Sequence, residues 1–185
     1  MDSGSKTAIY LGIGILVAIV GISIGLSSIE ETEFRPAQTI QNDDGTLEVA
    51  SMDKSQFKKA QKLVGIADYV NTTPDELAEL MKDKVVLYDI WTYSCINCIR
   101  TLPHITAWDE KYSDDGLLII GIHSPEFEFE KDVNNVMMAV EKNGIEYPVV
   151  LDNDKETWKA FENRYWPRKY IADDEGYIRY DHIGE

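Results

Sequence analysis

Two cysteines separated by two residues, Cys95 and Cys98, are the part of this sequence whose chemistry is easiest to specify. They are the only cysteines among the 185 residues, and at this spacing they do not join distant elements into a disulfide scaffold. A thiolate attacks a disulfide, and a second nearby thiol then releases the product from the mixed disulfide. The pair is therefore predicted to be redox-active, with Cys95 as the nucleophile and Cys98 as the resolving thiol.

The residues around the pair predict a strand that gives way to a helix. Residues 85–91 are mostly apolar, β-branched or aromatic, and the polar turn 92–94 follows them. If a helix begins at Cys95, its unpaired N–H groups and its dipole favour the thiolate form of this side chain. Cys98 then lies one turn further along the helix, close enough to form a disulfide with Cys95.

Asp89 lies within this otherwise apolar strand. A carboxylate that is buried without a partner is destabilising, and burial raises its pKa. A second interpretation stays open at this point, in which Asp89 lies on an edge strand and contacts water.

The spacing of four markers resembles the active site of the thioredoxin superfamily. The aspartate stands six residues before the first cysteine, Trp91 stands four before it, and Pro103 stands five after the second cysteine. Residues 91–103 are similar in particular to membrane-anchored thioredoxin-like proteins of the TlpA/DipZ type, which are related to alkyl hydroperoxide reductase/thiol-specific antioxidant domains. This resemblance implies a thiol–disulfide oxidoreductase.

The resemblance covers about residues 62–185, including the segments 121–127 and 163–167. It implies an α/β thioredoxin fold, a mixed central sheet with helices on both faces, carrying an extra helix–strand insertion at about 132–151. The family fold normally closes with a helix after its last hairpin, and that helix is not evident in the sequence.

The resemblance also implies roles for individual residues. Asp89 would help to remove the proton from Cys98. The Trp166–Pro167 bond would be the cis-proline peptide, beside which an extended substrate pairs with exposed backbone groups. Trp91 and Trp166 would line the substrate site. The residues themselves leave open an ordinary trans proline and tryptophans that belong to the core.

Metal binding and peroxide reduction are alternative functions for the same thiols. A zinc site needs about four ligands, and only His104, His123 and His182 are available to supplement the cysteines. A copper(I) chaperone would use the thiols with one of these histidines. Residues 92–95 contain the T-x-x-C of peroxiredoxins, but Tyr88 stands where those enzymes carry a proline. We therefore expect a redox pair without a resident metal or cofactor.

The composition narrows the range of partners. A formal net charge of −15 at pH 7 argues against binding to nucleic acid or to an anionic membrane surface, because both require a basic face. Protein disulfides or thiols, together with a membrane electron donor, are the partners that the resemblance implies.

The N-terminal run from Ala8 to Leu26 carries no charged side chain and approaches the roughly 20 residues that cross a membrane as a helix. Lys6 precedes it and three glutamates follow within 30–33, which orients the N-terminus toward the cytoplasm. A cleaved signal peptide, the alternative, has a shorter apolar region. We expect a single-pass protein of the cell membrane with a cytoplasmic N-terminus (1–7), an anchor (8–26), a linker (27–62) and an extracytoplasmic thioredoxin-like domain (63–185).

Hydrophobic periodicity and turn signals predict alternating strands and helices before a terminal hairpin. The predicted elements are helices at 55–62, 72–84, 95–111, 132–142 and 154–163, and strands at 85–91, 117–122, 147–151, 169–172 and 177–182.

A basic cluster of Arg164, Arg168 and Lys169 either assists the Cys95 thiolate or occupies a solvated turn.

Overall fold

The computed structural model of the protein describes residues 39–41, 47–49 and 53–185. β1 (Thr39–Gln41) and β2 (Leu47–Val49) pair with each other in antiparallel fashion, within a unit of their own. Residues 53–185 form a second compact unit, which contains both cysteines. The predicted membrane span 8–26 lies outside the described residues. Within the described part, no helix has both the length and the apolar character needed to cross a membrane.

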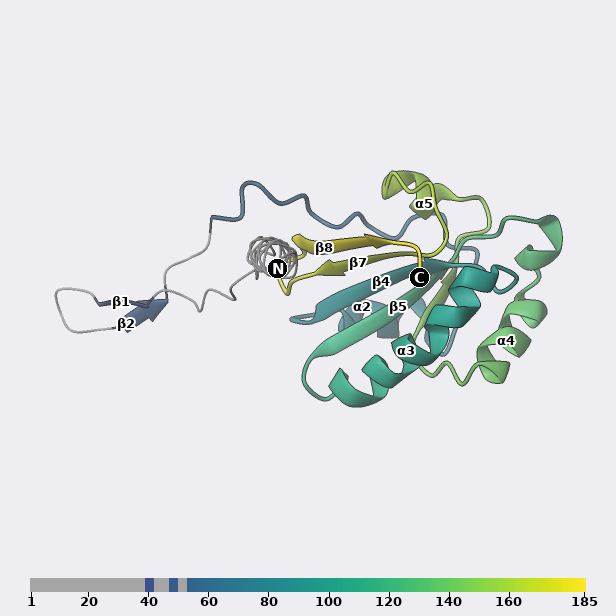
Figure 1. Ribbon diagram of the computed structural model, residues 1–185, viewed down its shortest axis with the longest axis horizontal. Helices are drawn as coiled ribbons and strands as arrows, with labels where there is room; N and C mark the ends of the chain where they lie inside the picture. Colours follow the sequence, from purple (N-terminus) through teal and green to yellow (C-terminus); the bar gives the residue numbers. More distant parts are fainter. Residues whose placement is uncertain (1–38, 42–46, 50–52) are drawn as a thin grey trace, which may run out of the picture. The chain divides into compact units, whose positions relative to one another are not determined.

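The second unit is built on a six-stranded mixed sheet with the strand order β3-β6-β5-β4-β7-β8 (Figure 1). β4, β5 and β6 run parallel, whereas β3 is antiparallel to β6, β7 to β4, and β8 to β7. β4, which leads to the cysteines, therefore has a neighbour on each side. The strands are β3 (Asp68–Val70), β4 (Val85–Trp91), β5 (Leu117–His123), β6 (Val149–Leu151), β7 (Arg168–Ala172) and β8 (Ile178–Ile183).

Helices cover both faces of the sheet, as the thioredoxin resemblance implied. α3 (Ile96–Tyr112) and α4 (Val133–Lys142) pack on one face, and the 3₁₀ helix η1 (Glu128–Lys131) precedes α4. α2 (Pro74–Leu80) and α5 (Glu156–Ala160) lie on the other face. In Figure 1, α3 crosses in front of the sheet and α2 lies behind it.

The alternation of side chains along β4 explains its apolar sequence. Successive residues of a strand point to opposite faces, so Leu87 and Trp91 enter the core beneath α3 while Tyr88 and Ile90 enter the core on the side of α2. Both faces are buried, so both sets are apolar. Asp89 shares the face of Leu87 and Trp91, which directs its carboxyl group toward the cysteine helix.

Most of the predicted elements are confirmed, and their ends shift by a few residues. The start of α2 is fixed as its sequence indicates, because Thr73 and Glu76 form a reciprocal capping box around Pro74. Four short elements, β1, β2, β3 and η1, are absent from the prediction, since three or four residues are too few to show a hydrophobic period.

The helix predicted at 55–62 is wrong. Ala60 N–H donates to Gly176 O at 2.8 Å, and Ile178 N–H donates to Lys58 O at the same distance. This segment therefore satisfies its backbone by pairing with the β7–β8 hairpin instead of with itself. Contact with the folded unit begins before residue 63, the predicted start of the thioredoxin-like domain.

Candidate active site

Cys95 ends the turn after β4 and caps the N-terminus of α3. Its Sγ accepts a hydrogen bond from the N–H of Cys98 at 3.3 Å, and its own N–H donates to Thr92 O at 3.2 Å. Helix N–H groups and the helix dipole stabilise negative charge on that sulfur. Cys95 is half-buried and reachable, Cys98 is fully buried, and both thiols are free. The predicted arrangement of the pair on a strand-to-helix turn is confirmed.

The environment of Cys98 favours the protonated thiol. Burial contributes most to raising the pKa of Cys98, and its hydrogen bonding with Cys95 and the negative charge of Asp89 add to the effect. A thiol attacks only after it has lost its proton. Cys98 therefore needs a proton acceptor close to it before it can resolve a mixed disulfide.

Asp89 is a carboxylate whose negative charge acts on Cys98. It is completely buried in a strand with neighbours on both sides, so the alternative of an edge-strand aspartate in water is wrong. Burial raises the pKa of Asp89, and the positive charge of Lys169 opposes this effect in part. Among the described residues, neither carboxylate oxygen accepts a hydrogen bond. The carboxylate is thus under-solvated and prone to take up a proton.

Lys169 belongs to this buried group. Its Nζ lies 3.4 Å from Asp89 Oδ1, and the side chain is only 8% exposed. Nζ also donates to Thr101 Oγ1 at 3.2 Å, and Thr101 donates to Cys98 O at 2.9 Å. Lys169 therefore links β7 to Asp89 and, through Thr101, to the first turn of the cysteine helix.

The basic cluster predicted from the sequence divides into three separate side chains. Lys169 points into the core because it is opposite Asp89 in the β4–β7 ladder. Arg168 forms a bidentate ion pair with Asp181 on β8, at 2.8 and 2.6 Å. Arg164 is exposed. The interpretation as one solvated turn is wrong for Lys169, whose burial follows from strand register and not from its local sequence.

Trp91 is completely buried, so its predicted contact with substrate is wrong. Its ring packs edge-on against His123, with the centroids 5.4 Å apart. A Cβ added at Gly121 would lie 3.0 Å from Trp91 Nε1 and 3.3 Å from Tyr147 Cε2, so the indole packs closely against the glycine backbone. Trp91 is a core residue beneath the site.

The peptide bond between Trp166 and Pro167 is cis, as the resemblance implied. Pro167 immediately precedes β7, whose first residue pairs with Ile90 of β4. Pro167 therefore lies at the end of the sheet where β4 gives way to the cysteine turn. Trp166 and Cys95 pack against the same core cluster beneath α3, although they are far apart in the sequence.

Trp166 is held from three sides. Its indole N–H donates to Ser124 O at 2.9 Å, its ring centroid lies 4.1 Å from that of Trp158, and Lys155 Nζ lies 4.5 Å above the ring. Within residues 53–185, no hydrogen bond engages the main-chain N–H or carbonyl oxygen of Trp166.

A second polar network fixes the turn before Cys95. Nε2 of the fully buried His123 lies 3.3 Å from Thr92 Oγ1 and 3.4 Å from the N–H of Tyr93. Burial lowers the pKa of His123 to about 4, while the charge of Glu130 opposes the shift. His123 is therefore a neutral imidazole at pH 7 and accepts a hydrogen bond from the turn.

Glu130 of η1 is the other anchor of that turn. Its carboxylate accepts hydrogen bonds from Ser94 Oγ and from the N–H groups of Glu126 and Phe127. Burial alone would raise the pKa of Glu130, but these hydrogen bonds outweigh it and lower the pKa. Glu130 was not indicated by the sequence, which named His123 only as a possible metal ligand. The separation of 36 residues between Ser94 and Glu130 leaves no local signal of their contact.

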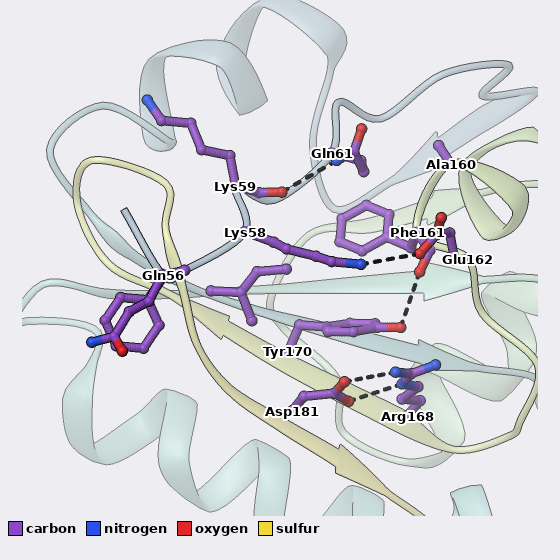
Figure 2. Close-up of a pocket in the computed structure, with 12 residues that line it drawn as sticks. Gln56, Lys58, Lys59, Gln61, Ala160, Phe161, Glu162, Arg168, Tyr170 and Asp181 are labelled. Carbon is purple, nitrogen blue, oxygen red and sulfur yellow. Dashed lines mark hydrogen bonds and ion pairs between the residues drawn. The ribbon is translucent and has the colours of Figure 1, made fainter. Parts of the chain in front are cut away.

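A cavity of about 700 Å³ lies on the face of the sheet that α2 and α5 cover, opposite to α3 (Figure 2). It is bounded by residues 56–61, by the end of α5 and by the β7–β8 hairpin. Lys58 contacts Glu162 at 3.3 Å and Arg168 contacts Asp181 within this cavity, and Figure 2 shows both ion pairs. Neither cysteine lines it, so the thiol chemistry takes place elsewhere.

Two observations concern the residues of the alternative functions. In residues 53–185, no three side chains of His, Cys, Asp or Glu are grouped so as to hold a metal ion. Thr92, the threonine of the T-x-x-C pattern, is fully buried against His123 and does not face solvent beside Cys95.

Residues 49–185 match the Redoxin family. The chain belongs to the Redoxin family. Within the thioredoxin superfamily, this Redoxin chain is DipZ/TlpA-like, as its active-site sequence indicated.

Two relatives and one solved structure illustrate the relationship. Protein DipZ of Mycobacterium tuberculosis is 44% identical over 128 residues, which make up 68% of this chain but only 18% of DipZ. Thiol-disulfide oxidoreductase YkuV of Bacillus subtilis is 29% identical over 106 residues, covering 57% of this chain and 71% of YkuV. The solution structure of a thioredoxin-like protein in the oxidized form superposes with a TM-score of 0.62 at 26% identity, covering 72% of this chain and 88% of that one.

Proposed function

We propose that this Redoxin protein is a thiol–disulfide oxidoreductase that exchanges its Cys95–Cys98 dithiol with disulfides or thiols of other proteins. One observation carries the proposal: a reachable Cys95 accepts the N–H of a buried Cys98 at a helix N-terminus, next to the buried Asp89. The family match and the oxidoreductase relatives support the same activity.

Reduction of a substrate begins at Cys95. Its thiolate attacks one sulfur of the substrate disulfide, the substrate S–S bond breaks, and a Cys95–substrate disulfide forms. The other substrate sulfur leaves as a thiolate and takes up a proton. The partial exposure of Cys95 and the N–H at its Sγ suit it to this first attack.

Resolution begins at Cys98. The thiol gives its proton to the Asp89 carboxylate and attacks Cys95 Sγ, which forms the Cys95–Cys98 disulfide and releases the second substrate thiolate. The protein dithiol loses two electrons and the substrate disulfide gains them; the reverse sequence oxidises a substrate dithiol. Lys169 is a positioning residue, because it holds Asp89 and the first turn of α3 in place.

The substrate chain would be held by the segment before β7. The free main-chain groups of Trp166 would pair with an extended substrate segment, and Pro167 would lie beside it. Trp166 is half-buried, fixed by Ser124 and continuous with the core that contacts Cys95.

The experiment for this proposal measures alkylation and turnover. At neutral pH, iodoacetamide should modify Cys95 much faster than Cys98 in the reduced protein. Cys95→Ser should abolish reduction of a protein disulfide, whereas the exposed-site variant Lys82→Ser should leave it unchanged. Equal alkylation of the two thiols, or an active Cys95→Ser variant, contradicts the proposal. The reduction potential of the couple then separates a reductase from an oxidant.

We also propose that residues 8–26 anchor the protein in the cell membrane, that residues 1–7 are cytoplasmic and that the redox domain is extracytoplasmic, with a membrane electron donor. The uncharged run and the charges on either side of it support this topology. The full chain should then fractionate with membranes, resist carbonate extraction and lose its redox domain to protease added outside the cell. Recovery of the intact chain in the soluble fraction would exclude the anchor.

A further inference from the structure

Two phenylalanines beside the redox site are exposed to solvent. Phe127 is 49% exposed and Phe129 is 56% exposed. Their rings are nearly parallel, with an angle of 6° between planes and 5.5 Å between centroids. Tyr93 extends the row, since its ring centroid lies 6.3 Å from that of Phe129. We call Tyr93, Phe127 and Phe129 the aromatic ridge.

The ridge is fixed to the protein at several points, so its shape exists before any ligand binds. Tyr93 Oη donates to Phe129 O at 3.1 Å, and the Tyr93 ring stacks on His123 with centroids 5.5 Å apart. The buried Glu130 accepts the N–H of Phe127 at 2.8 Å. Groups that are already ordered lose little conformational entropy on binding.

The ridge is continuous with the redox site on one side. Tyr93 lies two residues before Cys95, and Glu130 holds the intervening Ser94. On its other side, a cavity of about 310 Å³ is lined by Phe127 and Lys155, among others. Lys155 Nζ lies over the ring of Trp166, 4.5 Å from its centroid. A surface therefore runs from the ridge, across the cavity, to the residue that precedes Pro167.

We propose that the aromatic ridge and this cavity bind an aromatic or large aliphatic side chain of the substrate polypeptide, a few residues from its reacting cysteine. The inference rests on the proposed oxidoreductase function and names its substrate class. An extended segment that pairs with the main chain of Trp166 directs side chains alternately to either side of its backbone. A side chain on the appropriate side then covers Phe127 and Phe129, which removes apolar surface from water.

The chemistry of the cavity favours an uncharged side chain. Glu128 is paired with Lys131 at 3.0 Å, and Lys155 is directed at the tryptophan rings. Glu126 and Asp154 add negative charge to the lining. An acidic substrate side chain would be repelled here, and a charged side chain of either sign would lose hydration free energy when it is buried against apolar rings.

The test uses two disulfide peptides that differ at one position, with phenylalanine or serine two residues from the cysteine. The wild-type full chain should reduce the phenylalanine peptide with a kcat/KM roughly tenfold higher, which corresponds to about 1.4 kcal/mol. The double variant Phe127→Ser/Phe129→Ser should lose this preference but reduce cystamine, a small disulfide, at the wild-type rate. Tyr180→Ser removes an aromatic ring of similar exposure (53%) from β8 and should keep the preference.

Further arms separate folding and redox failure from failure of the inference. Phe127→Leu/Phe129→Leu retains apolar surface and should restore much of the preference. Peptides with serine in place of cysteine bind without reacting, so NMR chemical-shift titration compares the phenylalanine and serine versions directly. Equal kcat/KM or equal binding of the two peptides by the wild type, or a preference that survives in Phe127→Ser/Phe129→Ser, overturns the inference. Failure of the wild type to reduce cystamine refutes the proposed redox function instead. The NMR binding comparison then still tests whether the aromatic ridge binds the phenylalanine side chain.

Discussion

Replacement of Lys169 by methionine tests the buried charge pair. Methionine has a similar length and fills irregular space in a core, so Lys169→Met removes the charge with little change of volume. The lysine ammonium lies 3.4 Å from Asp89 Oδ1 and is almost completely buried. Its removal leaves the carboxylate without a compensating charge.

The magnitude follows from the distance. Two unit charges 3.4 Å apart attract by about 5 kcal/mol at an effective dielectric constant of about 20. Loss of this attraction raises the pKa of Asp89 further above its ordinary value. A carboxyl group that binds a proton is neutral and no longer buries an uncompensated charge. The loss of stability at neutral pH should therefore stay below the roughly 3–5 kcal/mol typical of a broken buried pair.

The consequence for catalysis is a shift in pH dependence. A protonated Asp89 does not accept the proton of Cys98, so release of the mixed disulfide at pH 7 should slow by about tenfold or more and recover at higher pH. Stopped-flow measurement of this step from pH 6 to 10, with the Asp89 carboxyl carbon titrated by NMR, reports both effects. Lys159→Met, at an exposed lysine of α5, is the control.

Two results would refute this reasoning. One is a Lys169→Met variant whose pH profile for mixed-disulfide release superimposes on that of the wild type. The other is a carboxyl titration of Asp89 that moves to lower pH.

Three more variants test the account. Asp89→Asn should slow release of the mixed disulfide but not the first attack. Because burial raises the pKa of Asp89 above 3.8, urea unfolding should show that the wild type loses stability relative to this variant as the pH rises through the pKa of Asp89 in the folded protein. The wild type should lose about 3 kcal/mol of its free energy of unfolding as the pH falls from 6.5 to about 4, and His123→Asn should not show this loss. The same dependence of unfolding free energy on pH in both proteins would argue against a neutral buried His123. Trp166→Phe loses the hydrogen bond to Ser124, so thermal unfolding should show a loss of about 1 kcal/mol in stability. Turnover of protein disulfides should fall more than turnover of cystamine, and equal losses for the two substrates would argue against a substrate-binding Trp166.

Local sequence was sufficient for the cysteine turn. The apolar run of β4, the polar turn and the helix start are all encoded within about 20 residues, and so is the spacing of six residues from Asp89 to Cys95. The cis peptide at Trp166–Pro167 followed from resemblance and not from the local pattern.

The rest of the site depends on contacts between distant segments. Lys169 resembles its basic neighbours in sequence, and only the pairing of β7 with β4 brings it to Asp89. Glu130 reaches Ser94 because η1 folds back over the turn. Trp91 was predicted to line the substrate site, but its position in β4 and the missing side chain at Gly121 place it in the core.

Trapping of the mixed disulfide tests the central claim most directly. The protein should attack through Cys95 and resolve through Cys98, so Cys98→Ser treated with a protein disulfide should accumulate a covalent one-to-one adduct, mapped to Cys95 by mass spectrometry of non-reduced peptides. Cys95→Ser should form none under the same conditions. An adduct that maps to Cys98, or equal trapping by the two variants, would contradict the assigned roles.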